Sequence, residues 1–151
     1  TETVNLLPLA QEAAENLRAA AEAKNVSIIV SGENVPVTGV RRLLYEIVYN
    51  LCDNAIKYNV DGGSVDVRVG AEGGSACLTV RDTGIGIPPE HQSRIFERFY
   101  RVDKSHSKAS GGTGLGLSIV KHAVAYHHGT IALKSEVGKG TEITVRFPQE
   151  K

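Results

Sequence analysis

Two short segments of alternating apolar and polar residues constrain the fold of this chain more than any other feature. Residues 65–69 (VDVRV) and 76–80 (ACLTV) place an apolar side chain at every second position, and the linker GAEGGS separates them. Alternation of this kind puts the apolar side chains of a strand on one face, and a short glycine-rich linker favours a hairpin. A hairpin with one apolar face needs a second layer of structure to cover that face.

Helical periodicity elsewhere in the chain supplies this second layer. Apolar residues recur at steps of three and four, which predicts amphipathic helices, over residues 5–23, 40–58 and 115–127. A shorter helical piece is expected after the Pro88-Pro89 pair. Further strands are predicted over residues 26–30, 130–135 and 141–147. The sequence therefore predicts an α+β fold, a two-layer α/β sandwich in which helices cover one face of a mixed sheet of about five strands.

Composition limits the classes of partner and compartment. The 151 residues, 41% of them hydrophobic, suit one domain spanning residues 1–151. Seventeen basic and seventeen acidic residues cancel, which argues against a broad electrostatic surface for nucleic acid or membrane. Cys52 and Cys77 lie in apolar runs, so reduced core thiols and a reducing compartment are expected. The chain does not begin with Met and has no signal peptide or long apolar span, so we expect a fragment of a longer protein.

Residues 45–58 (YEIVYNLCDNAIKY) carry a polar stripe on a predicted helix. At about 100° per residue, the stripe contains Glu46, Asn50, Asn54 and Lys57, with Tyr58 at its edge. Asparagine is a poor helix former, so two asparagines in mid-helix favour a function. An amide oxygen suits a hard cation such as Mg²⁺, and a lysine one turn later can meet phosphate charge. The alternative is an ordinary solvated helix face.

Residues 80–90 (VRDTGIGIPPE) place a carboxylate where a predicted strand ends. Asp82 is followed by Gly84 and Gly86, which let the backbone bend sharply. A carboxylate in this position could accept a hydrogen bond from an exocyclic amine, as on adenine, and would repel the oxygen of guanine. The alternative is a common Asp-Thr-Gly turn.

Residues 111–122 (GGTGLGLSIVKH) run from a glycine-rich loop directly into a predicted helix. Such a loop can cradle phosphate with backbone N–H groups, although it can also be a simple linker. It is neither a Rossmann motif, because Leu117 stands in place of the last glycine, nor a P-loop, which needs Gly-Lys-Ser/Thr. Before it, the segment RIFERFYRVD contains Phe96 and Phe99 as expected core residues and Arg101 as the arginine best placed to reach a terminal phosphate. The polar residues that follow predict a mobile segment.

Together these segments resemble the catalytic ATP-binding domain of bacterial sensor histidine kinases, within the gyrase, Hsp90, histidine kinase and MutL superfamily. Residues 50–58 resemble the N box of the family, 82–87 its first glycine box, 96–101 its F box and 112–117 its second glycine box. The resemblance covers essentially the whole chain. It implies a Bergerat-type fold with three covering helices and a protein-histidine kinase module that uses ATP and Mg²⁺.

The resemblance also implies roles for individual residues. Asn54 would coordinate Mg²⁺, Asn50 and Lys57 would support metal and phosphates, and Arg101 would join them as a catalytic residue. Residues 102–112 would form a lid over ATP. The implied nucleotide-binding set is Asn54, Tyr58, Asp82, Gly84, Gly86, Ile87, Gly112, Thr113, Gly114, Leu115 and Gly116. Within this set Tyr58 would pack on adenine and Asp82 would bind its amino group.

The same resemblance separates phosphoryl transfer from hydrolysis. Hydrolysing members carry a glutamate one helical turn before the metal-binding asparagine, and this chain has Asn50 there, so efficient hydrolysis is not expected. The alternatives are a gyrase-like or Hsp90-like ATPase and a non-catalytic ATP-sensing module.

The chain is not expected to contain its own phosphoacceptor. Its five histidines, which do not lie in acceptor-like sequences and are expected at the surface or at helix caps, are His91, His106, His122, His127 and His128. The resemblance implies an acceptor histidine in a dimerising helical hairpin of the same kinase before residue 1, and a response regulator downstream. It also implies a cytoplasmic location in a parent that is itself membrane-anchored. The isolated domain is expected to be a monomer that binds ATP and ADP and no nucleic acid.

Overall fold

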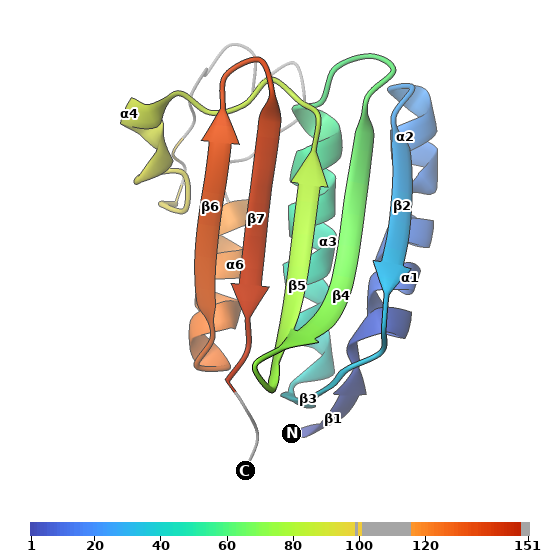
Figure 1. Ribbon diagram of the computed structural model, residues 1–151, viewed down its shortest axis with the longest axis vertical. Helices are drawn as coiled ribbons and strands as arrows, with labels where there is room; N and C mark the ends of the chain where they lie inside the picture. Colours follow the sequence, from blue (N-terminus) through green and yellow to red (C-terminus); the bar gives the residue numbers. More distant parts are fainter. Residues whose placement is uncertain (99, 101–115, 149–151) are drawn as a thin grey trace.

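A five-stranded sheet forms one layer of the molecule (Figure 1). The computed structural model describes residues 1–98, 100 and 116–148. The strand order is β2-β4-β5-β7-β6, in which β2 runs parallel to β4 and the other neighbours are antiparallel. The strands are β2 Ser27–Gly32, β4 Ser64–Glu72, β5 Ser75–Asp82, β6 Thr130–Glu136 and β7 Gly140–Arg146. The predicted mixed sheet is therefore confirmed, and its central hairpin is the one that the alternating segments predicted.

The helices form the second layer and lie on one face of the sheet (Figure 1). They are α1 Leu6–Asn16, α2 Arg18–Ala23, α3 Arg41–Lys57 and α6 Gly116–Tyr126, with the short α4 Pro89–Gln92 beyond the sheet edge. The predicted first helix is interrupted at Leu17, where φ is −101° and ψ is 1°, so it forms two helices. The other two long helices agree with their predictions to within one residue at almost every end.

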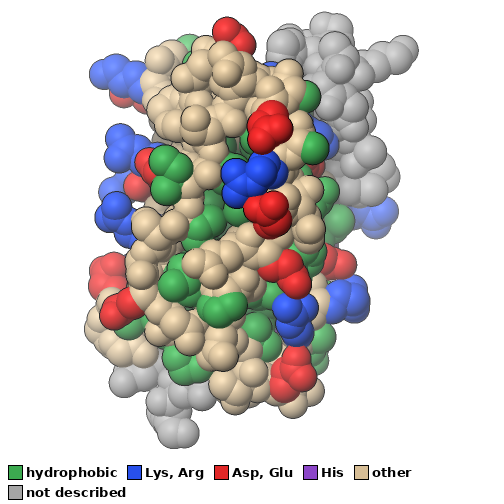
Figure 2. All heavy atoms as spheres, turned by 90° about the vertical axis from the view of Figure 1, so that its right-hand side faces the viewer, with side chains coloured by type: hydrophobic (Ala, Val, Ile, Leu, Met, Phe, Trp, Pro, Cys, Tyr) green, Lys and Arg blue, Asp and Glu red, His purple; other side chains and the backbone are tan. Residues whose placement is uncertain are grey.

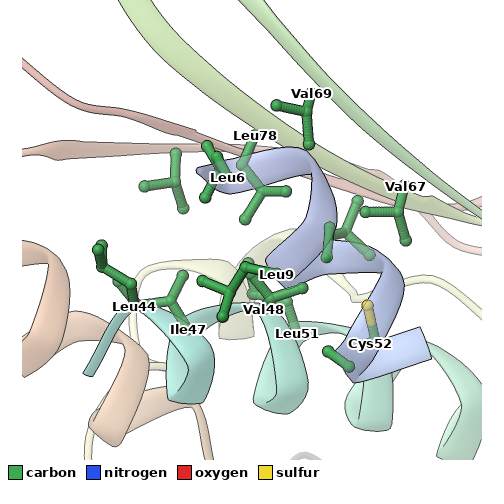
Figure 3. Packing of buried hydrophobic residues seen from close by; sticks show 14 of the residues in the cluster. Leu6, Leu9, Leu44, Ile47, Val48, Leu51, Cys52, Val67, Val69 and Leu78 are labelled. Carbon is green, nitrogen blue, oxygen red and sulfur yellow. The ribbon is translucent and has the colours of Figure 1, made fainter. Parts of the chain in front are cut away.

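The register of the central hairpin turns its apolar residues toward the helices. Val67 is paired with Val80 and Val69 with Leu78, and all four side chains are buried. The facing residues of α1 and α3 complete one hydrophobic cluster (Figure 3). The labelled members are Leu6 and Leu9 of α1, Leu44, Ile47, Val48, Leu51 and Cys52 of α3, and Val67, Val69 and Leu78 of the sheet.

The outer face of the sheet is polar. One row of paired residues crosses four strands. It runs from Asp66 through Arg81 and Glu142 to Lys134, so the charge changes sign from each strand to the next. Opposite charges in directly facing positions stabilise a solvated sheet face. The side of the molecule formed by α1, α2 and β2 also mixes acidic and basic side chains (Figure 2). This agrees with the zero net charge of the sequence.

A second, two-stranded sheet was not predicted. β1 Glu2–Asn5 pairs with β3 Pro36–Gly39 in antiparallel register. Val4 and Val37 face each other and are each 5% exposed, so they extend the core beneath the start of α3. Four-residue strands are too short for alternation to reveal them.

The two cysteines lie as predicted. Cys52 and Cys77 are free thiols, and both are buried. Burial, helped by the charge of Asp53, raises the pKa of the Cys52 thiol to about 12. Within the part of the chain described by the structure, no helix has both the length and the apolar character needed to cross a membrane.

His127 is a capping histidine, one of the two roles expected for it, and it is buried. The side chain is 8% exposed, its Nδ1 donates to the carbonyl oxygen of Ala123 at 2.7 Å, and its Nε2 accepts from the backbone N–H of Val40 at 3.1 Å. Val40 is the N-cap residue of α3, so His127 caps that helix from the far end of α6. His91 is half-buried and hydrogen-bonds to Tyr100. His122 and His128 are exposed as expected, and His106 lies outside the described residues.

Candidate nucleotide-binding site

The polar stripe of α3 forms the first part of the candidate site. Asn50, Asn54 and Lys57 are all half-buried, while the opposite face of the helix is fully buried in the core. The Asn50 side-chain nitrogen donates to the Glu46 carbonyl oxygen at 2.8 Å, which fixes the orientation of the amide. Its Oδ1 lies 3.3 Å from the point where a Cβ on Gly116 would stand, so this oxygen faces the beginning of α6.

Lys57 is held by a carboxylate one turn before it. Its Nζ lies 2.9 Å from Asp53 Oδ2, and both side chains are about three-quarters buried, at 30% and 24% exposed. Such partial shielding from water strengthens an ion pair relative to a fully exposed one. Because of this pair, the ammonium group stays close to the stripe.

Asp82 forms the second part of the site, at the last position of β5. Its Oδ1 accepts hydrogen bonds from the N–H groups of Gly84 at 2.8 Å and of Thr141 at 3.1 Å. Burial raises the pKa of this carboxyl above its usual value, although the two backbone hydrogen bonds act in the opposite direction. Among the described residues both bonds go to Oδ1, so Oδ2 is the oxygen that can accept a hydrogen bond from a ligand.

The first glycine box joins these two parts. The Ile85 N–H donates to the carbonyl oxygen of Tyr58 at 3.0 Å, so the backbone after Asp82 lies directly against the end of α3. A Cβ on Gly84 would stand 2.4 Å from the same Tyr58 oxygen, a distance that real Cβ atoms do not reach. Glycine is therefore required there by close approach, and the predicted residues Tyr58, Asp82 and Gly84 are brought together.

The β6–β7 hairpin forms a wall that sequence reasoning missed. Gly86 has φ +76°, and a Cβ on it would stand 2.1 Å from the Glu136 carbonyl oxygen. Ser135 Oγ accepts from the Ile87 N–H at 2.8 Å and lies 2.8 Å from Thr141 Oγ1. The hydroxyl of Ser135 thus connects the glycine box to the strand that binds Asp82.

Gln92 adds a second link to the same wall. Its Nε2 donates to the carbonyl oxygens of Ile87 at 2.8 Å and Ser135 at 3.1 Å. The sequence signal for this wall was the pair of glycines in residues 136–140 (EVGKG). Gly140 has φ +115°, and a Cβ on it would stand 2.1 Å from the Asp82 carbonyl oxygen, so the contact requires glycine there. Two glycines in a hairpin loop are too common to indicate this contact.

Several predicted site residues lie outside the described part of the chain. These are Arg101, Gly112, Thr113, Gly114 and Leu115, together with the whole predicted lid at residues 102–112. Gly116 is described and begins α6 beside Asn50. Phe96 of the F box packs against the core as predicted, whereas Phe99 is not described.

The described residues do not offer a conventional acidic metal centre. Within them, no group of three or more His, Cys, Asp or Glu side chains is placed to hold a metal ion. A hard cation at α3 would therefore depend on amide oxygen and on oxygens of the ligand itself. A separate hollow of about 430 Å³ lies among β1, α1 and the start of α3, and no predicted site residue lines it.

Comparison with known proteins identifies the family. Residues 39–151 match the family described as histidine kinase-, DNA gyrase B- and HSP90-like ATPases. The chain is 40% identical over 149 residues to the sensor-like histidine kinase SenX3 of Mycolicibacterium smegmatis, covering 98% of this chain and 39% of that protein. It is 45% identical over 122 residues to the sensor histidine kinase RppB of Synechocystis sp., covering 81% of this chain and 27% of that protein. The chain thus spans about two-fifths or less of these curated relatives.

Solved structures give the same result. The mycobacterial sensor histidine kinase MprB superposes with a TM-score of 0.84 at 32% identity, covering 97% of this chain and 96% of that one. Full-length ShkA in complex with AMPPNP superposes with a TM-score of 0.84 at 30% identity, covering 96% of this chain and 30% of that one. The chain therefore belongs to the histidine kinase-, DNA gyrase B- and HSP90-like ATPase family, as the catalytic ATP-binding domain of a sensor histidine kinase.

Proposed function

We propose that this domain binds Mg²⁺-ATP and donates the γ-phosphate to a histidine on a separate dimerisation domain of its parent kinase. The observation that carries the proposal is the contact between the end of α3 and the backbone after Asp82, through the Ile85 N–H and the Tyr58 carbonyl oxygen. This contact supports the proposal because it brings the backbone after Asp82 against the end of the helix that carries the polar stripe. ShkA, a structural relative, was solved with AMPPNP, an ATP analogue.

At the base end, the free Oδ2 of Asp82 accepts the amino group of adenine, and Tyr58 packs against the ring. At the phosphate end, Asn54 holds the cation through its amide oxygen, and Asn50 and Lys57 support the phosphates. The fixed amide of Asn50 suits this role, because its nitrogen is held by Glu46 and its oxygen is turned toward α6. Bound Mg²⁺ supplies neutralisation of phosphate charge.

The glycine-rich segments hold the rest of the nucleotide. Backbone at Gly84, Gly86 and Ile87 lies along the base and sugar, and residues 112–116 bring N–H groups to the phosphates. The start of α6 adds the positive end of its helix dipole. Arg101 completes the set from the segment before the predicted lid.

Transfer is favoured over hydrolysis by the chemistry of Asn50. A neutral amide cannot take a proton from water, so this side chain does not activate a hydrolytic nucleophile. Phosphoryl transfer needs mainly positioning and charge stabilisation, which the proposed set provides. The partner is the dimerisation and histidine phosphotransfer domain of the same kinase, on the cytoplasmic side of a membrane-anchored parent, with a response regulator acting after it.

The test uses labelled ATP with this chain alone and with the histidine-bearing helical hairpin of its parent. The expected result is acid-labile label on the hairpin only, at a rate that rises with concentration because the tether is absent. Label on this chain alone would contradict the assignment of the acceptor to another domain. Rapid phosphate release without any acceptor would place the chain among the hydrolysing members of the family instead.

A further inference from the structure

Asn59, which follows the end of α3, is a buried polar residue. Its side chain is 5% exposed and makes three hydrogen bonds. Its Nδ2 donates to the Ser64 carbonyl oxygen at 3.0 Å, and its Oδ1 accepts from the Val60 N–H at 2.8 Å and from the Thr83 hydroxyl at 3.1 Å. This side chain therefore joins two segments that are 24 residues apart.

Thr83 is the second residue of the first glycine box, and its hydroxyl is fully engaged. Its Oγ1 accepts from the Ser64 N–H at 2.9 Å while it donates to Asn59 Oδ1. A hydroxyl has a single proton, so Thr83 has no donor left for a ligand. Gly63 lies close against both side chains, because a Cβ on it would stand 2.1 Å from Asn59 Oδ1 and 2.7 Å from Thr83 Oγ1.

We propose that Asn59 and Thr83 are positioning residues that fix the separation between the two residues at the base end of the nucleotide site, Tyr58 and Asp82. Each is the immediate neighbour of a residue assigned to the nucleotide, Tyr58 in one segment and Asp82 in the other. The bond between their side chains therefore holds Tyr58 and Asp82 at a fixed distance and orientation. A site that is already ordered binds its ligand more tightly, because less conformational entropy is lost on binding. This inference rests on the proposed function, since it assumes that one nucleotide spans Tyr58 and Asp82.

The direct test is Thr83→Val, which removes the hydroxyl and keeps the shape of the side chain. Thr83 is exposed, so the substitution leaves the core intact. ATP affinity measured by calorimetry is expected to fall roughly fivefold, the effect of about one net hydrogen bond. Thr83→Ser is expected to retain the affinity of the parent protein. The matched control is Thr79→Val on the outer face of β5, where the hydroxyl lies 3.3 Å from Thr144 Oγ1, and no change is expected.

A double-mutant cycle with Asp82→Asn separates positioning from simple stabilisation. If Thr83 acts through Asp82, Thr83→Val will cost much less affinity in the Asp82→Asn background, and it will reduce the preference for ATP over GTP in the parent background. Additive losses with an unchanged ATP-to-GTP preference would overturn the inference. An unaltered protein that binds no ATP would overturn the proposed function and the inference together, whereas normal ATP binding by Thr83→Val would overturn the inference alone.

Discussion

Replacing Asp82 by asparagine tests the base end of the site with the smallest change in shape. The side chain must still accept two backbone hydrogen bonds, from Gly84 and Thr141. In Asp82→Asn the amide oxygen is therefore expected to take the place of Oδ1, and the NH₂ group takes the place of Oδ2. The NH₂ group then faces the amino group of adenine, which is also a donor, so no hydrogen bond forms. The same NH₂ group could donate to the carbonyl oxygen of guanine.

The size of the effect follows from the lost charge-assisted bond. Hydrogen bonds to charged groups contribute roughly 1.5 to 3 kcal/mol, and about 1.4 kcal/mol corresponds to a tenfold change in affinity. The Kd for ATP should therefore rise between about tenfold and a hundredfold. The affinity for GTP should fall less or increase.

The fold of this variant is expected to survive, because the carboxylate is costly to the folded state. The pKa of Asp82 is raised by burial, so the folded protein binds this proton more strongly than the unfolded chain does. Below pH 3.8, the ordinary pKa of an aspartate, Asp82 is protonated in both states and its ionisation does not lower the free energy of unfolding. That free energy falls as the pH rises through the raised pKa of the folded state. At neutral pH, where the cost is fully present, Asp82→Asn should have a melting temperature equal to or above that of the parent protein.

Calorimetric titration with ATP and with GTP, in the presence of Mg²⁺, measures both affinities. The matched control is Asp66→Asn, because Asp66 is exposed on the outer face of β4 and should leave nucleotide affinity unchanged. Unchanged ATP affinity in Asp82→Asn, or equal affinity of the parent protein for ATP and GTP, would refute this assignment of Asp82.

Three further outcomes are expected. Asn54→Ala should keep the helix, since alanine is a good helix former, and should abolish most of the gain in ATP affinity that Mg²⁺ gives; an unchanged ratio of affinities with and without Mg²⁺ would show the stripe to be a solvated face. ATP affinity should fall on acidification at a higher pH than an ordinary aspartate would cause, because protonation of Asp82 at its raised pKa removes the acceptor; a loss only near pH 3.8 would contradict this. With a pKa of about 12, Cys52 is thiolate in only about one molecule in ten thousand at pH 8, so it should react with thiol reagents at the rate of unfolding measured by circular dichroism; rapid labelling of the native protein would disprove its burial.

The long periodic patterns were sufficient to predict the main elements. α3 was expected over residues 40–58 and spans Arg41–Lys57, because its apolar residues repeat regularly over several turns. The pairing of β1 with β3 could not be predicted, because each strand has four residues and their contact depends on the fold between them. The break at Leu17 also gave no signal, since leucine is a good helix former.

Some residues of the candidate site could also be predicted from the sequence, and others could not. Asn50 was predicted as a site residue because asparagine is a poor helix former in mid-helix, and Asp82 because it ends a predicted strand shortly before two glycines. Ser135 and Asn59 could not be predicted, because serine and asparagine are ordinary in turns and hairpins. Their importance comes only from partners that are 48 and 24 residues away, the Ile87 N–H and the Thr83 hydroxyl. His127 likewise reaches Val40, 87 residues away, so its burial had no local signal.

The start of β1 and the end of β7 lie at one pole of the molecule, and the loops around Asp82 lie at the other (Figure 1). A fluorophore, affinity tag or surface linker joined ahead of β1 is therefore attached at the pole opposite Asp82. A histidine carried on a segment ahead of Thr1 would likewise be attached far from the loops around Asp82. Under the proposed function, such a histidine would reach the γ-phosphate only if the domain turned about its attachment so that the loops around Asp82 faced the acceptor. Under the proposed function, the orientation of the domain relative to that segment would therefore decide whether transfer can occur.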